Sequence, residues 1–190
     1  MHPIKQFESW FAEAQAAGVA MPEAVCLATA DADGRPSARM VLFKGVADEG
    51  LTFYTNYTSR KAEQIAANPH AALVFHWVEM ERQMRFEGRV AKLDAERSDA
   101  YFASRGRGSR LSAWASRQSQ TVDDRQQLER QYAEIVERFE GQEVPRPDFW
   151  GGYLLTIERA EFWVGREHRF HDRQEFRLVD GVWTERRLQP

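Results

Sequence analysis

The sequence has little of what several functional classes require. Cys26 is the only cysteine among 190 residues, which excludes an internal disulfide and a zinc site built from several thiolates. No apolar run approaches the roughly 20 residues that cross a bilayer, and the first residues lack a basic-then-apolar signal. These features predict a cytoplasmic protein that makes no membrane contact.

Charge and motifs narrow the possibilities further. The 26 lysines and arginines are outnumbered by 29 acidic residues, for a net charge of -3, so the chain lacks the overall basic field that nucleic-acid binding uses. The five histidines lack metal-ligand spacing except His168 and His171, which strand alternation would put on opposite faces, and Glu79, Glu81 and Glu87 do not form a convincing metal set. The phosphate-loop and dinucleotide glycine fingerprints are missing, as is any recognisable nucleophile motif. We expect no metal, no nucleic-acid partner and no covalent catalysis.

The elements that are present predict one mainly β domain over residues 1–190. With 43% hydrophobic and 12% aromatic residues, the chain can fill a single core. Helical spacing predicts an N-terminal helix at about 4–17, a short helix at 59–68 and a helical insertion at about 94–140. Apolar runs bounded by turn residues predict strands at 24–30, 37–44, 50–55, 71–77, 83–93 and 153–163, followed by a hairpin around Asp180-Gly181. This order favours a β-barrel with helical insertions over a doubly wound sheet.

One apolar stripe lies within the helical insertion. Its residues recur at helical spacing in the segment 123–139, so we expect them to be core. They are Leu128, Tyr132, Ile135, Val136 and Phe139.

The most informative cationic segment is Arg169-Phe170-His171-Asp172-Arg173. If it lies on a strand, alternation projects Arg169, His171 and Arg173 from one face, a row that suits a small anionic ligand. The alternative is a solvated strand edge whose charges discourage aggregation. The other basic segments favour the ligand.

Two further basic segments are candidate phosphate sites. Ser59-Arg60-Lys61 begins a predicted helix, where cations oppose the macrodipole unless an anion is bound; the alternative is a helix whose cations face water. The segment 104–110 combines three arginines with two glycines, which suits phosphate oxygens, although it also resembles an RNA-binding Arg-Gly segment. The polar cluster 116–120 could contact a phosphate or a heterocycle. We therefore expect two phosphorylated small molecules, one of them a cofactor.

Six segments, in order over nearly the whole chain, form a further pattern: Arg39-Met40-Val41-Leu42-Phe43-Lys44, Phe53-Tyr54-Thr55-Asn56, Ser59-Arg60-Lys61, Glu81-Arg82-Gln83, Phe149-Trp150-Gly151-Gly152 and Arg169-Phe170-His171-Asp172-Arg173. Together these segments resemble those of one enzyme family, the pyridoxine (pyridoxamine) 5'-phosphate oxidases. The resemblance implies an FMN-binding split β-barrel that forms a homodimer, with FMN at the subunit interface.

The resemblance also implies roles for individual residues. The FMN-binding set is Arg39, Met40, Val41, Leu42, Phe43, Lys44, Tyr54, Thr55, Arg60, Lys61, Gln83, Gln118, Ser119, Trp163 and Arg173. The substrate-binding set is Lys44, Tyr101, Arg105, Ser109, Arg169 and His171, of which Arg169 and His171 are the catalytic pair. Strand alternation puts Arg39 and Lys44 on opposite faces, so both reach one site only if the strand bulges, bends or lines an interface.

The implied reaction converts pyridoxine 5'-phosphate or pyridoxamine 5'-phosphate to pyridoxal 5'-phosphate, in vitamin B6 metabolism. A hydride passes from the substrate C4' to FMN, and O2 accepts the electrons to give H2O2. Two alternatives remain open: an FMN oxidase of the same fold that acts on another substrate, such as a phenazine precursor, and a non-catalytic carrier of FMN or pyridoxal phosphate.

Overall fold

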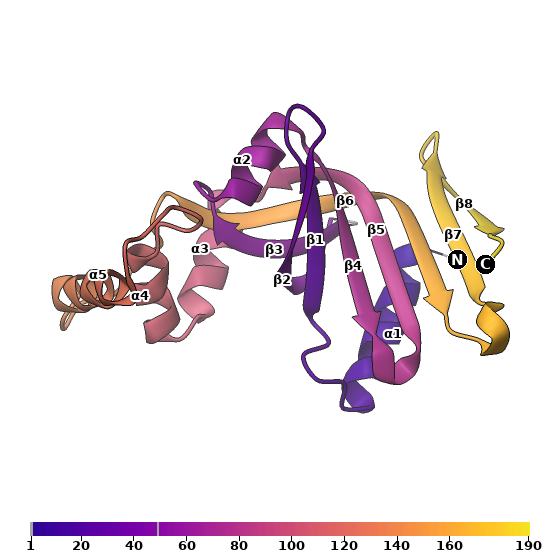
Figure 1. Ribbon diagram of the computed structural model, residues 1–190, viewed down its shortest axis with the longest axis horizontal. Helices are drawn as coiled ribbons and strands as arrows, with labels where there is room; N and C mark the ends of the chain where they lie inside the picture. The colour runs from indigo at the N-terminus through magenta and orange to yellow at the C-terminus, as the bar shows by residue number, and fades with distance from the viewer. Residues whose placement is uncertain (1, 49) are drawn as a thin grey trace.

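The computed structural model describes residues 2–48 and 50–190, and its centre is a closed antiparallel barrel of six strands (Figure 1). The strand order is β3-β2-β1-β4-β5-β6, and pairing of β3 with β6 closes the ring, while β7 and β8 continue the sheet from β6. The strands are β1 Ala24–Ala30, β2 Pro36–Ala47, β3 Gly50–Asn56, β4 His70–Trp77, β5 Arg82–Lys92, β6 Trp150–Val164, β7 Asp172–Val179 and β8 Val182–Arg187. The mainly β barrel expected from the sequence is confirmed.

Helices cover parts of the barrel and extend from it. In Figure 1, α3, α4 and α5 lie together at the opposite end of the molecule from β7 and β8. The helices are α1 Pro3–Ala16, α2 Arg60–Ala67, α3 Ala95–Ser104, α4 Arg107–Ala115 and α5 Arg125–Arg138, with 3-10 turns η1 Val78–Met80 and η2 Glu167–Arg169. Within the described ranges, every helix is too short or too polar to cross a bilayer.

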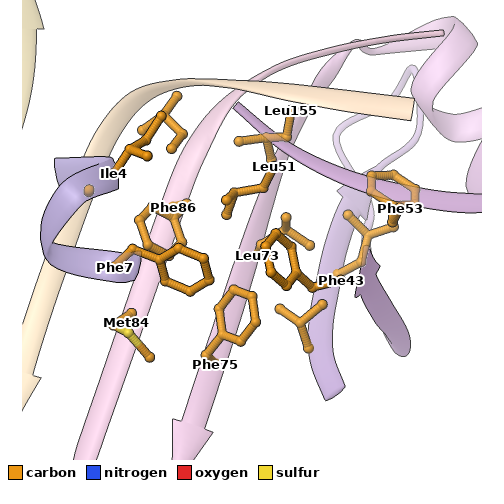
Figure 2. Packing of buried hydrophobic residues seen from close by; sticks show 14 of the residues in the cluster. Ile4, Phe7, Phe43, Leu51, Phe53, Leu73, Phe75, Met84, Phe86 and Leu155 are labelled. Carbon is orange, nitrogen blue, oxygen red and sulfur yellow. The ribbon is translucent and has the colours of Figure 1, made fainter. Parts of the chain in front are cut away.

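The N-terminal helix α1 packs one apolar side against the core of the barrel. Pro3 occupies the first turn of α1, where its missing N–H costs nothing, and the His2 side chain accepts the Ile4 N–H. The amphipathic spacing then places Phe7 against Phe43, Phe75 and Phe86, with ring centroids 5.0 to 5.2 Å apart (Figure 2). Edge-on and tilted packing of these rings contributes beyond their buried area.

Strand β6 connects the barrel to the C-terminal strands, because it pairs with β3 and β5 in the barrel and also with β7. Its register with β5 shifts between Glu87 and Gly88, which marks a β-bulge. Only glycine fits at 88, since a Cβ there would overlap the backbone oxygen of Thr156. The strand can therefore bend from the barrel into the extension of the sheet formed by β7 and β8.

The expectation that the stripe on α5 is core is wrong for most of its length. Leu128, Tyr132 and Val136 are 41%, 37% and 40% exposed, whereas Phe139 is buried. The helix packs against α4 on one side and lies outside the barrel (Figure 1). A periodic pattern identifies an apolar face but not what covers it.

Two basic segments also differ from expectation. Most of the predicted loop 104–110 is the beginning of α4, since the helix starts at Arg107. The run 169–173 is not one strand, because Arg169 ends η2 with φ of 61° and β7 begins at Asp172. The chain must reverse direction between antiparallel β6 and β7, and the left-handed residues His168 and Arg169 make that turn. Arg169, His171 and Arg173 therefore do not share a strand face.

Candidate functional site

A pocket of about 280 Å³ lies where β2 and β3 meet α2 and α3. It joins residues from both predicted phosphate groups, which are distant in sequence. Its lining residues are Met40, Val41, Leu42, Lys44, Tyr54, Thr55, Lys61, Tyr101, Arg105, Gln118 and Trp150. All except Trp150 were predicted site residues.

One end of this pocket carries a buried lysine. Lys61 is 8% exposed, and its Nζ donates to Thr55 Oγ1 at 3.1 Å, Ser59 Oγ at 3.3 Å and Gln118 Oε1 at 2.5 Å. All three acceptors are neutral, so burial, with a further contribution from the charge of Arg39, lowers the pKa of Lys61 to about 8. A bound anion would compensate this charge, and the phosphate of a nucleotide fits.

Arg39 adds a second cation next to the same helix, from the other face of β2. Its guanidinium donates to Thr29 Oγ1 at 2.6 Å, Ser37 Oγ at 2.8 Å and Gln64 Oε1 at 3.1 Å. Burial, followed by the charge of Arg60, lowers the pKa of Arg39. Gln64, on α2, was missed by sequence reasoning although it follows the Ser59-Arg60-Lys61 motif by one helical turn.

The structure keeps Arg39 and Lys44 on opposite faces of β2, as strand alternation predicts. Burial alternates along β2, with Met40, Leu42 and Lys44 more exposed than their odd-numbered neighbours. The register shift against β3 falls between Phe43 and Val46, so it does not bring Arg39 to the face of Lys44. Lys44 lines the pocket and Arg39 does not.

The other end of the pocket presents an arginine with an unused donor. Arg105 follows α3 directly, and its guanidinium carbon lies 4.6 Å from the centre of the Trp150 ring. Its Nη1 is buried and has no hydrogen-bond partner among the described residues, and burial lowers the pKa of Arg105. A buried donor without a partner is costly, so this atom fits a ligand that brings an acceptor, such as a phosphate oxygen.

A second group of predicted residues lies at the other end of β6. Gln83, Trp163 and Arg173 are paired directly across β5, β6 and β7, so they share one face of the sheet. His171 packs against Trp163, with ring centroids 4.6 Å apart. The Nδ1 of His171 accepts the backbone N–H of Arg166 at 3.1 Å, which leaves the proton of the neutral ring on Nε2. Arg169 is exposed in η2, beside this group.

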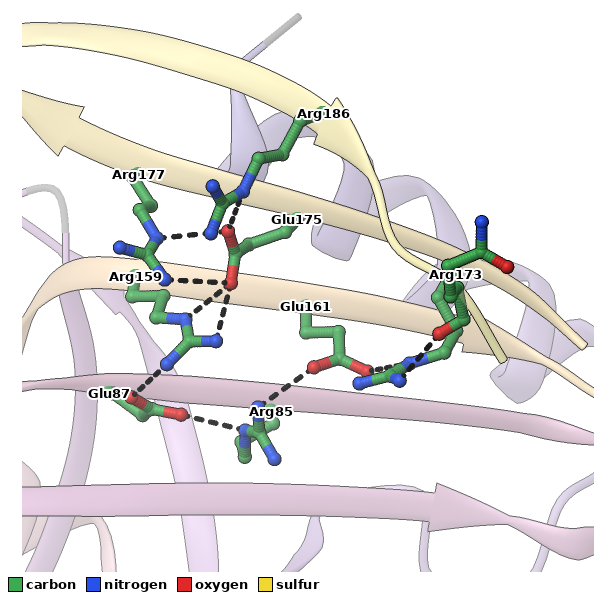
Figure 3. A network of polar contacts seen from close by, with 9 residues as sticks. Arg85, Glu87, Arg159, Glu161, Arg173, Glu175, Arg177 and Arg186 are labelled. Carbon is green, nitrogen blue, oxygen red and sulfur yellow. Dashed lines mark hydrogen bonds and ion pairs between the residues drawn. The ribbon is translucent and has the colours of Figure 1, made fainter.

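Two buried carboxylates hold arginines on and around this second group, among them Arg173 (Figure 3). Glu161 is 4% exposed and accepts hydrogen bonds from Arg173 Nε and Arg85 Nη2, both at 2.8 Å. Glu175 is fully buried; its desolvation opposes ionisation, but hydrogen bonds from its arginine partners outweigh this and lower its pKa to about 2. Those partners are Arg186, Arg177 and Arg159. Sequence reasoning missed both glutamates, because the pairing of strands was not known.

The two groups do not meet within one chain. The pocket is lined by none of Gln83, Trp163, Arg169, His171 and Arg173, and Figure 1 places α3 and α4 far from β7. The remaining predicted residues are outside the pocket lining: Arg60, Ser109 and Ser119 are exposed, and the side chain of Phe43 is in the core.

Comparison with known families gives two consecutive matches. Residues 11–139 match the family described as pyridoxamine 5'-phosphate oxidase. Residues 150–190 match the pyridoxine 5'-phosphate oxidase C-terminal dimerisation region. Together the two matches cover both groups of site residues.

Relatives that match this chain over nearly its whole length carry descriptions that agree with the two family matches. A pyridoxine/pyridoxamine 5'-phosphate oxidase of Rubrobacter xylanophilus is 56% identical over 99% of this chain and 87% of the relative. One from Cupriavidus taiwanensis is 54% identical over 99% of this chain and 89% of the relative. Among solved structures, PhzG from Burkholderia lata, in complex with tetrahydrophenazine-1-carboxylic acid, superposes with a TM-score of 0.94 at 32% identity, covering 100% of this chain and 93% of that one. An FMN-binding protein from Nostoc punctiforme, 18% identical over 100% of this chain and 98% of its own, shares the fold with a TM-score of 0.80.

Proposed function

The chain belongs to the pyridoxamine 5'-phosphate oxidase family, and we propose that it oxidises pyridoxine 5'-phosphate and pyridoxamine 5'-phosphate to pyridoxal 5'-phosphate. It is a flavoprotein that uses FMN and a homodimer built through its C-terminal region. The observation that carries the proposal is the pocket with a cation at each end, Lys61 and Arg105, neither of which has an anionic partner among residues 2–48 and 50–190.

FMN would be held by its phosphate next to α2. Lys61, Arg39 and Arg60 supply the positive charge there, while Thr55 and Gln118 orient the lysine. Tyr54 and the segment of β2 from Met40 to Lys44 would line the rest of the cofactor. When bound, FMN supplies the two-electron redox chemistry, and the protein supplies binding, orientation and charge.

The substrate phosphate would occupy the other end of the pocket. Arg105 offers its unpaired Nη1, and Lys44 and Tyr101 line the same cavity. Ser109, on α4, is a further proposed ligand although it is exposed in the isolated chain. Holding the phosphate fixes the distance from this anchor to the carbon that reacts.

The residues for the chemical step would come from the partner subunit. Arg169, His171 and Arg173 lie far from the pocket of their own chain, yet they belong to the region matched as a dimerisation region. We therefore place FMN and substrate at the interface, between the pocket of one subunit and the second group of the other. Arg169 would hold the substrate over the flavin, and His171 would position it through the Nε2 proton. Arg173, fixed by Glu161, would stabilise negative charge that develops on the cofactor.

The reaction itself gives the first test. The purified protein should be yellow, and pyridoxine 5'-phosphate added in air should yield one H2O2 for each aldehyde formed, because O2 is the proposed acceptor. A colourless protein that takes up no FMN, or a yellow one that gives no peroxide with either substrate, would refute the proposal.

Two alternatives are separated by the same assay. An oxidase for a phenazine precursor needs no phosphate cradle, so it would oxidise a non-phosphorylated substrate as well as a phosphorylated one. A carrier would bind ligand without turnover. The unpaired donor of Arg105 favours the phosphorylated substrate.

The proposal that each site combines the pocket of one subunit with the second group of the other has its own test. With pyridoxine 5'-phosphate kept below the parental KM, Arg105→Ala and Arg169→Leu homodimers should each retain only a small fraction of the parental activity, whereas a mixed dimer keeps one intact site. Mixing the two after reversible dissociation should restore activity toward about one quarter of the parental value, because half of the randomly formed dimers are mixed and each has one working site. If activity does not recover although mixed dimers form, the two groups act within one chain.

A further inference from the structure

Trp150 is the pocket residue to which neither the expected flavin set nor the expected substrate set gives a role. It is the first residue of β6, and its ring is 7% exposed, yet it lines the pocket together with Arg105 and Tyr101. One explanation for Trp150 is a purely structural role, since the ring also packs in the cluster of Phe102, Leu111 and Phe139. Its contacts on the pocket side argue for more than packing.

Three aromatic rings form a nearly parallel stack at this end of the pocket. Tyr54 and Tyr101 are 3.9 Å apart at 22°, and Trp150 lies 5.7 Å from Tyr54 at 17° and 6.2 Å from Tyr101 at 7°. The neighbouring glycines permit this arrangement: a Cβ on Gly152 would lie 2.7 Å from the Tyr54 ring. The Phe149-Trp150-Gly151-Gly152 segment thus builds a platform under residues proposed to contact ligand.

The guanidinium of Arg105 lies over this platform. Its central carbon is 4.6 Å from the centre of the Trp150 ring and 5.4 Å from that of Phe102. A carboxylate could also orient an arginine, as Glu161 orients Arg173, but it would neutralise the charge and compete with an incoming phosphate. An aromatic face holds a cation through its quadrupole and leaves the N–H donors unused, which agrees with the unpaired Nη1.

We propose that Trp150 is a positioning residue that orients the Arg105 guanidinium for the substrate phosphate without neutralising it. The inference rests on the proposed function only for the identity of the phosphorylated ligand. It predicts that Trp150 sets preference for phosphorylated over non-phosphorylated substrate, and that it acts through Arg105. A residue that merely packs would change stability and would affect both substrates alike.

The test compares kcat/KM for pyridoxine 5'-phosphate with that for pyridoxine in FMN-loaded enzyme. Cation–π contacts are worth about 0.5–2 kcal/mol, so Trp150→Leu should lower the ratio of the two kcat/KM values about 2- to 30-fold. The loss should fall mainly on KM. Trp150→Phe, which keeps an aromatic face, should restore part of the parental ratio of kcat/KM values. This second variant keeps the test valid if Trp150→Leu does not fold.

Trp114 offers a matched control. It belongs to the same cluster and also has a guanidinium over its ring, that of Arg138 at 4.9 Å, but it does not line the pocket. Trp114→Leu should leave the substrate ratio unchanged. In an Arg105→Ala background, Trp150→Leu should lower the ratio no further, because the residue through which it acts is gone.

A binding measurement makes the outcome independent of turnover. Inorganic phosphate titrated calorimetrically into FMN-loaded protein should bind more weakly to Trp150→Leu and Arg105→Ala than to the parent and Trp114→Leu. Unchanged phosphate affinity and substrate ratio in both Trp150 variants, or effects that add fully to those of Arg105→Ala, would overturn the inference. A parent that binds phosphate but yields no peroxide would instead overturn the proposed function.

Discussion

Replacing Lys61 with methionine should have opposite effects on the stability of the flavin-free protein and on flavin binding. The folded protein holds this lysine with a pKa of about 8 against an ordinary 10.5, and each pKa unit corresponds to about 1.4 kcal/mol. After allowance for screening by water, the buried charge costs the flavin-free fold about 2–3 kcal/mol at neutral pH. Its removal leaves Thr55 and Gln118 hydrogen-bonded to each other at 2.8 Å. Lys61→Met should therefore raise the free energy of unfolding of the flavin-free protein by about 1–3 kcal/mol, while FMN affinity falls.

The pH dependence of both quantities follows from the same shift. Between pH 8 and 10.5 the folded protein loses the Lys61 proton while the unfolded chain keeps it, so the unfolded state binds more protons and stability from this group rises with pH. The FMN phosphate favours the protonated lysine, so FMN affinity should fall above pH 8, by at most about tenfold per pH unit. Both trends should be absent in Lys61→Met.

Urea denaturation of the flavin-free protein and fluorescence titration with FMN from pH 7 to 10 measure the two effects. Lys5→Met, on the exposed side of α1, is the control, since the same substitution there should change neither. A Lys61→Met protein that is less stable than the parent, or parental FMN affinity that stays constant from pH 7 to 10, would refute the reasoning.

Three further predictions follow from the site and its supports. Arg169→Leu should lower kcat about 100-fold while FMN affinity, measured by flavin fluorescence, stays within about twofold, and an unchanged kcat would remove Arg169 from the chemistry. Arg105→Ala should raise KM for pyridoxine 5'-phosphate about 10- to 100-fold but leave KM for pyridoxine nearly unchanged; equal KM values in mutant and parent would contradict the phosphate role. Glu175→Gln should cost about 3 kcal/mol in urea denaturation, since three arginines lose the negative charge that they share and one of its two acceptor oxygens. Because its pKa is lowered from 4.5 to about 2, the parent should lose this stability as pH falls through that window, and the variant should not.

Most strands could be predicted from the sequence, because the alternating runs are short and bounded by turn residues. The run 24–30 coincides with β1, and the turn at Asp180-Gly181 joins β7 to β8. Local sequence patterns gave wrong predictions for segments whose structure depends on tertiary contacts. Gly106 and Gly108 indicated a loop, but Gly106 only precedes α4 and Gly108 lies within it. The exposed side of α5 shows the same periodicity as a buried one.

The candidate site, like the fold, could be predicted from the sequence only in part. Residue types that bind phosphate, such as Lys61 and Arg105, can be recognised in the sequence, and the structure brings them to one pocket. The cationic row at 169–173 was predicted from strand alternation, which fails because η2 interrupts it. The supports of the site, Gln64, Trp150 and Glu161, come from elements paired across long sequence separations. No local pattern reports such pairings.

The course of β6 bears on how this scaffold can diversify. Trp150 is the first residue of the strand and Trp163 lies near its end, so about 40 Å of extended chain separates the end proposed to recognise a phosphate from the end proposed to act on the reacting carbon. Mutations at one end therefore leave the geometry of the other intact. An ancestral oxidase could exchange one recognised substituent for another through changes near Trp150 and Arg105 alone, while its redox machinery was inherited without alteration.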